Sequence, residues 1–274
     1  MSSGDRRHFG PGTLAALVVA NMIGAGVFTT SGYTLADLGS PGRVLAAWVV
    51  GGAIAICGAI GYGALARRLT ESGGEYLFLS RALHPAAGFV AGWISLIAGF
   101  TGAIAFAAHA FESYVRPAGS SWYPNLVAVA AIMVATAVHA IRPRIGAFGQ
   151  NGVVVAKLLV LAGFVGFAVV KWAGGSRSWP VCEPAAFSLS AFAGSLVWIS
   201  LSYSGFNAAV YVSGEARDPA RVVPASMLRA TFAVAAIYLA LNIIFVGFVP
   251  CEDVMGRPDV AVAAAASLLG DPGA

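Results

Sequence analysis

Long apolar runs alternate with short polar segments along the chain, and each run is about as long as the 20 residues that a helix needs to cross a bilayer. We predict seven membrane-spanning helices from this pattern, which makes the chain an all-α, multi-pass membrane protein. The expected spans cover residues 12–38, 44–66, 85–115, 124–141, 152–173, 187–213 and 226–249.

The first and sixth runs are interrupted near their middles. The first contains NMIGAGVFTTSG, which includes Gly24 and Gly26, and the sixth contains LVWISLSYSGFNAAVYV. An unpaired backbone group is costly in hydrocarbon, so a break is tolerated where it lines a cavity or meets a ligand. Backbone N–H groups and the positive end of the following half-helix suit a carboxylate. Two breaks five spans apart predict a midplane site in a five-plus-five inverted repeat, although such glycine pairs also serve helix packing.

Composition narrows the class of protein further. Hydrophobic residues make up 58% of the 274 residues, charged residues only 10%, and the mean hydropathy is +0.80. A soluble domain carries about 25% charged residues. We find no Ser/His/Asp set, metal-ligand cluster or phosphate-binding loop, so we expect no enzyme activity, cofactor or bound metal. Residues 1–11 are polar and basic and run directly into the first span, which predicts a retained membrane helix rather than a cleaved signal peptide.

Basic residues concentrate in the loops on one side of the predicted spans, eleven against five. The richer side normally faces the cytoplasm, so we expect a cytoplasmic N-terminus, 1–11, in the plasma membrane. Seven spans then place the tail, 250–274, outside, with a short Ala-rich helix over 259–269. The richer side holds Arg6, Arg7, Arg67, Arg68, Arg81, Arg142, Arg144, Lys157, Arg217, Arg221 and Arg229; the other holds Arg43, Arg116, Lys171, Arg177 and Arg257.

The three cysteines are too few for a disulfide framework. Cys57 lies inside an apolar run and is expected to be a small buried hydrophobic residue. Cys182 and Cys251 lie in outer loops that flank the sixth and seventh spans. A disulfide between them is one alternative in an oxidising compartment, and we predict two free thiols.

Three segments in order, NMIGAGVFTTSG, ESGGEYLFLSRAL and SLSYSGFNAAVYVSGEARDPARVVPAS, resemble the amino acid–polyamine–organocation permeases, in particular their amino-acid permease and L-type transporter branch. The resemblance runs from about residue 10 to the last residue. It implies the LeuT-type fold, which has about twelve spans in this family. Residues 12–173 then correspond to the first five-helix repeat, and 187–249 to the first two helices of the second.

The resemblance also implies residue roles. The unwound stretch of the first helix binds the substrate carboxylate through backbone groups, and the sixth-helix stretch accepts the ammonium while a bulky side chain closes the site. Leu201 stands at that gate position, and Trp198, one turn earlier, is the candidate to replace it. The expected substrate-binding residues are Ile23, Gly24, Ala25, Gly26, Ser95, Phe100, Trp198, Leu201, Ser202, Tyr203 and Ser204.

Lys157 is the charge at the start of the fifth span, and a lysine at membrane depth points to function. One interpretation is that its ammonium reaches the cytoplasmic interface. The resemblance favours another, in which Lys157 bonds carbonyls of the first helix at the position that sodium takes in sodium-coupled relatives. A permease of this kind is sodium-independent and works by proton coupling or exchange.

The predicted function is alternating-access transport of neutral amino acids, because no acidic residue is placed to hold a cationic side chain. The resemblance implies no disulfide-linked heavy chain, since loop 116–123 lacks the cysteine found there in animal L-type relatives. A homodimer stays open. Two alternatives remain: a truncated fragment that does not transport, and a seven-helix receptor or photosensor. The absence of a lysine in the seventh span and the predicted cytoplasmic N-terminus oppose the latter.

Overall fold

The computed structural model describes residues 9–115, 123–141, 143–173, 180, 182 and 186–269, without the side chains of residues 139 and 143–151. The regular elements in this part of the chain are helices. The described residues also contain one isolated β-bridge, between Phe9 and Ala216. In order they are α1 Pro11–Met22, α2 Gly26–Leu38, α3 Pro41–Arg68, α4 Gly74–Ala82, α5 Pro85–Ile94, π-helix η2 Ser95–Thr101, α6 Gly102–Val115, α7 Leu126–Ile141, α8 Pro143–Ala173, α9 Leu189–Ser202, 3₁₀-helix η3 Ala208–Glu215, α10 Pro219–Gly247, α11 Cys251–Val254 and α12 Val260–Leu269.

Four described helices are long and apolar enough to span a membrane: Pro41–Arg68, Pro85–Val115, Gly152–Ala173 and Pro219–Gly247. The pair Pro11–Met22 and Gly26–Leu38 makes a fifth, bent by 43° at its break. Two shorter apolar helices, Leu126–Val138 and Leu189–Ser202, fall in the other predicted spans. The all-α membrane architecture and the break in the first span are therefore confirmed. The sixth span is helical for a shorter distance than predicted, because its α-helix ends at Ser202.

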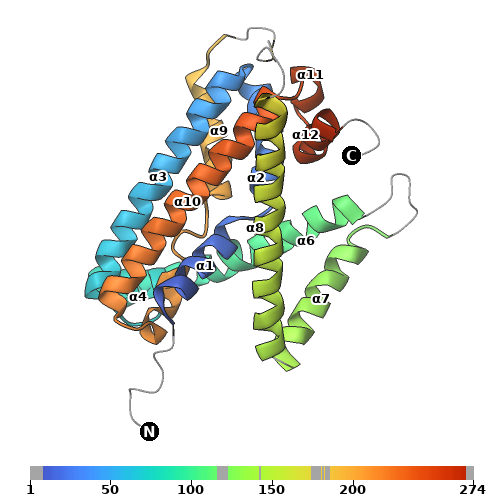
Figure 1. Ribbon diagram of the computed structural model, residues 1–274. Coiled ribbons are helices and arrows are strands. Elements are labelled where there is room, and N and C mark those ends of the chain that lie inside the picture. The colour runs from blue at the N-terminus through green and yellow to red at the C-terminus, as the bar shows by residue number, and fades with distance from the viewer. Residues whose placement is uncertain are drawn as a thin grey trace. The chain divides into compact units, whose positions relative to one another are not determined.

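The described residues form two compact units, one from Met1–Phe78 with Phe164–Ala274 and one from Leu79–Gly163. In the first unit α3 packs along α10, α1 lies against α10, and α2 lies against α9 (Figure 1). A buried aromatic cluster of Trp48, Tyr203 and Tyr238 fills the centre of this unit, with ring centroids 5.1–5.6 Å apart. The cluster joins α3, the residue that follows α9, and α10.

The second unit contains α5, η2, α6 and α7. Its buried carboxylate, Glu112, accepts hydrogen bonds from the backbone N–H groups of Asn125 and Ala128, each at 2.9 Å. These donors belong to the start of α7, where N–H groups have no partner within the helix. Glu112 therefore caps α7 and joins it to α6.

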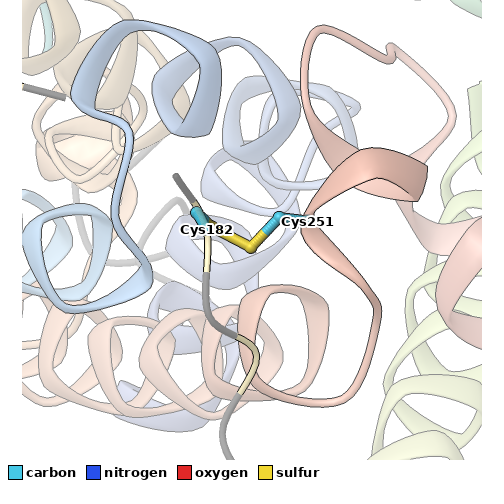
Figure 2. Close-up of a disulfide and its surroundings, with 2 residues drawn as sticks. All are labelled: Cys182 and Cys251. Atoms are coloured by element: carbon cyan, nitrogen blue, oxygen red, sulfur yellow. A yellow bond between two sulfur atoms is a disulfide. The ribbon is translucent and has the colours of Figure 1, made fainter. Parts of the chain in front are cut away.

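Cys182 and Cys251 form a disulfide, with their Cα atoms 5.5 Å apart (Figure 2). The prediction of two free thiols was therefore wrong, because Cys182 lies beside Cys251, the first residue of α11, although 69 residues separate them. Cys57 is free, as expected, but it is exposed on α3 rather than buried.

The first unit has two chemically distinct ends. At one, which we call the basic end, the backbone of Phe9 pairs with that of Glu215 and Arg217. At the other, which we call the disulfide end, Gly256 N–H donates to Gly32 O at 2.9 Å. Arg257 also bonds Asp259 there, at 2.8 and 3.0 Å, which lowers the pKa of that carboxyl.

Candidate functional site

The first break separates α1 from α2. α1 ends at Met22 and Ile23 turns into an extended conformation (φ −77°, ψ 92°), after which α2 begins at Gly26. Gly24 is exposed at the bend, and a Cβ added to it would meet nothing within 4 Å. The space beside Gly24 is therefore open, at the bend that precedes the N-terminal end of α2.

The second break follows α9. The α-helix ends at Ser202, the chain turns through residues 203–207, and it continues as the 3₁₀-helix η3. Gly205 has a φ of +103°, a conformation that other residues rarely adopt. The C-terminal end of α9, whose last residue Ser202 is buried, is thus followed by a turn that depends on this glycine.

The two breaks lie against each other. A Cβ on Gly26 would be 2.6 Å from Ser202 Oγ and 3.1 Å from Ser202 Cα. A Cβ on Gly205 would be 2.8 Å from the carbonyl carbon and oxygen of Asn21. An added methyl group would collide at both positions, with the Asn21 backbone at Gly205 and with Ser202 at Gly26. The start of α2 and the end of α9 therefore meet in one place, as the sequence predicted from the paired interruptions.

One side chain on α10, that of Tyr238, contacts both breaks. The buried Tyr238 hydroxyl on α10 lies 2.6 Å from Met22 O and 3.2 Å from Ser202 O, the last carbonyls of α1 and α9. The backbone of Gly24 also forms a hydrogen bond with this hydroxyl. Carbonyls at helix ends lack partners within the helix and carry partial negative charge. A shared hydroxyl donor therefore holds two helix ends that would otherwise repel.

Hydroxyl and amide groups connect α2 to its neighbours on either side. Thr30 Oγ1 and Ser202 Oγ are 3.0 Å apart, and both side chains are buried. Ser31 donates to the Asn242 side chain, whose Nδ2 donates in turn to Tyr238 O at 2.8 Å. These contacts fix the half-helix that begins at Gly26 against α9 and α10.

The other predicted binding residues near the breaks differ in exposure. Ile23, Ser202 and Tyr203 are buried, whereas Ser204 is exposed and Ala25 is half-buried. The gate candidates Trp198 and Leu201 are 58% and 60% exposed on α9. Their closure over a substrate stays a prediction.

Ser95, Phe100 and Lys157 belong to the second unit. Ser95 and Phe100 both lie on the π-helical segment η2, a rare local geometry that is frequent at functional sites. Lys157 is partly buried on α8. The placement of these three side chains beside the two breaks stays a prediction.

Comparison with known proteins identifies the family to which this arrangement belongs. The sequence profile of the family described as "Amino acid permease" matches residues 9–272, almost the entire chain. The chain belongs to the amino acid permease family. This assignment confirms the resemblance found in the sequence and leaves the receptor and photosensor alternative without support.

Several curated transporters are similar to this permease-family chain. The mouse b(0,+)-type amino acid transporter 1 is 29% identical over 259 residues, which is 90% of this chain and 52% of that protein. The human large neutral amino acids transporter small subunit 2 is 27% identical over 278 residues, 97% of this chain and 52% of that protein. The chain spans about half the length of these relatives. Their names describe transporters rather than enzymes, in agreement with the sequence prediction.

Sequence reasoning missed Tyr238 and Asn242, whose side chains bond the helices at the breaks. Both lie in the apolar run ATFAVAAIYLALNIIFVGF, four residues apart and hence on one helix face. Two polar side chains on one face of a spanning helix were the available signal, since such residues usually bond across helices.

Proposed function

We propose that this chain builds the amino-acid-binding core of a permease that carries its substrate across the membrane by alternating access. The observation that supports this most is the meeting of the two breaks, with Gly26 against Ser202 and Gly205 against Asn21. A break in a spanning helix is tolerated where it lines a cavity, and paired breaks in transporters bracket the substrate.

The two helix ends at the breaks are complementary to an α-amino acid zwitterion. The N-terminal end of α2 carries partial positive charge and unpaired N–H groups, which suit the α-carboxylate. The C-terminal end of α9 carries partial negative charge, which suits the α-ammonium. Ala25 and Gly26 bind the first group in this proposal, and the turn from Ser202 to Ser204 binds the second.

Neutral amino acids are the preferred substrates in this proposal. The side chains around the breaks are hydroxyl-bearing or apolar, as in Thr30, Trp198 and Leu201. One group of relatives is named for large neutral amino acids. A cationic substrate side chain needs a carboxylate partner in a low-dielectric site. None of the residues proposed to bind the substrate carries one, and the nearby Glu75 carboxylate is engaged by Asn207 and Tyr211.

Lys157 is the proposed coupling group. Its ammonium bonds carbonyls of the first break, so that the protein works without sodium, as a proton symporter or an exchanger. A partly buried lysine at membrane depth supports this role.

The proposed setting is the plasma membrane, with the basic end of the first unit in the cytoplasm. The excess of basic residues on that side supports this orientation. A disulfide at the opposite end agrees with an oxidising exterior. We propose no disulfide-linked heavy chain and leave a homodimer open.

Uptake into proteoliposomes tests this function. Purified protein in sodium-free buffer should accumulate radiolabelled leucine or alanine and reject arginine and putrescine. Stimulation by a proton gradient identifies symport, and a requirement for internal amino acid identifies exchange. Absence of uptake of every amino acid by folded protein contradicts transport and supports the non-transporting alternative.

Lys157→Gln tests the coupling role, with Lys171→Gln at the other end of the same span as its matched control. We expect the first variant to lose most uptake at saturating substrate, because a neutral side chain cannot replace the ammonium at the first-helix carbonyls. Lys171 lies 5.6 Å from the Phe167 ring near the helix end, so its replacement should leave uptake within about twofold. Equal uptake by both variants would contradict the assignment.

A further inference from the structure

We infer that Glu75 is a positioning residue that holds the basic-end half of the second break, and so sets which side of the binding site is closed. The motif ESGGEYLFLSRAL contains this residue, and the proposed function gives it no role. The mechanistic meaning of the inference rests on the proposed transport function. Its structural content does not, because it concerns contacts within the first unit.

The Glu75 carboxylate receives hydrogen bonds from two side chains of the second break. Asn207 Nδ2 donates to one carboxylate oxygen, and the Tyr211 hydroxyl donates to the other. Asn207 ends the turn after α9, and Tyr211 lies in the middle of η3. One carboxylate on α4 therefore forms hydrogen bonds with both the turn and the 3₁₀-helix that follows it.

The glycine directly before Glu75 allows this approach. Gly74 has a φ of +55°, and a Cβ on it would be 2.4 Å from the Tyr211 ring. Any other residue at Gly74 would force the ring away from the carboxylate. The glycine at position 74 thus has a physical reason that lies in the second break, whereas a Cβ on Gly73 would meet Leu77 of α4 itself.

Further contacts hold the same segment along its length. Ser72 Oγ accepts a hydrogen bond from Gly214 N–H at 3.0 Å. The Phe206 ring lies 5.6 Å from the Tyr62 ring, and a Cβ on Gly58 would be 2.7 Å from Phe206. Residues 206–214 are therefore fixed to α3 and to the segment that leads into α4.

The strength of these hydrogen bonds makes Glu75 the contact whose loss would free η3. Hydrogen bonds to a carboxylate are about twice as strong as neutral ones, and short 3₁₀-helices such as η3 have weaker internal hydrogen bonds than α-helices. The external carboxylate therefore supplies much of the order of η3. Alternating access requires one side of the site to open, and losing the Glu75 bonds frees the basic-end side first.

Hydrogen exchange of the purified protein tests the contacts directly. Glu75→Gln leaves one amide oxygen where two carboxylate oxygens accepted, so amides in residues 206–216 should exchange about tenfold faster or more. Tyr211→Phe should do the same, and the double variant should add little to either. Glu71→Gln and Tyr76→Phe are the matched controls, because both residues are exposed in the same motif. Unchanged exchange in Glu75→Gln would overturn the inference.

The sidedness of transport distinguishes a positioning role of Glu75 from a role in stability alone. In oriented proteoliposomes, Glu75→Gln should shift the ratio of the apparent KM values at the two faces about fivefold or more, while the control Glu71→Gln keeps the wild-type ratio. A loss of maximal rate with an unchanged KM ratio would overturn the gating role. If the wild-type protein shows no uptake, the proposed function fails, and the exchange measurement still decides the inference about Glu75.

Discussion

Tyr238 shows how one side chain organises the candidate site. Its hydroxyl bonds the last carbonyls of α1 and α9, and its ring packs against Trp48 and Tyr203. The packed ring therefore holds the hydroxyl in position, and the hydroxyl holds the ends of α1 and α9 together.

Tyr238→Phe removes the shared donor and keeps the ring. We expect a loss of about 1–2 kcal/mol of stability, because two buried carbonyls lose their partner, together with weaker amino-acid binding. Thermal unfolding and binding titration measure the two effects. Thr231→Val is the matched control: its buried hydroxyl on the same helix donates to Met227 O at 2.8 Å, within α10, so binding should be retained. Equal binding in both variants would show that the Tyr238 hydroxyl does not position the site.

The glycines of the first break should respond differently to the same added methyl group. Gly26→Ala collides with Ser202 and should cost about 1–3 kcal/mol of stability by overpacking. Gly24→Ala meets nothing within 4 Å and should change stability by less than about 0.5 kcal/mol. If the space beside Gly24 holds substrate, this second variant should nevertheless lose amino-acid binding.

Gly61→Ala on α3 controls for the added methyl group, since a Cβ at that position would also meet nothing within 4 Å. Thermal unfolding and ligand titration of the three variants provide the comparison. Full binding by Gly24→Ala would place the substrate elsewhere.

At the scale of elements, the sequence predicted the two helix breaks well. It predicted poorly where α9 ends and which cysteines pair. Both interruptions were visible because glycine and small polar residues stand out in an apolar run, and Gly26, Ser202 and Gly205 do meet. The extent of α9 was not visible, because the residues of η3 are as apolar as those of a helix. The disulfide was missed since pairing across 69 residues depends on tertiary contacts that no local pattern encodes.

The helix α2 also holds the short helices at the disulfide end. Gly32 O accepts from Gly256 N–H, and a Cβ on Gly32 would lie 2.0 Å from Arg257 O. Gly32→Ala should therefore push α11 and α12 away from α2 and speed hydrogen exchange in residues 252–262 by about tenfold. Gly42→Ala is the matched control, because its Cβ would meet only Ser40 Oγ, at 3.9 Å. Equal exchange in the two variants would contradict this packing.

At the scale of the molecule, the first unit is closed by different means at its two ends. Backbone pairing of Phe9 and the Glu75 bonds close the basic end, while the disulfide and Gly32 close the other. The sequence predicted the separation of the ends from charge alone. It did not predict the contacts, which join residues far apart in the chain.

Loss of the disulfide should destabilise the whole unit. Because the bond closes a loop of 69 residues, Cys182→Ser should lower the free energy of unfolding by about 2–4 kcal/mol. Thermal unfolding with and without reductant measures this, and reductant should have no further effect on the variant. Cys57→Ser controls for loss of a thiol that forms no disulfide. A reductant-insensitive wild-type protein would contradict the covalent link.

The central claim is that the paired helix ends bind both charges of an amino acid. The most direct test is calorimetric titration of the purified protein with leucine, leucinamide and N-acetyl-leucine. We predict that leucine binds and that each analogue, which lacks the carboxylate or the ammonium, binds at least about tenfold more weakly. Equal affinity for all three ligands, or no binding of leucine by folded protein, would contradict the claim.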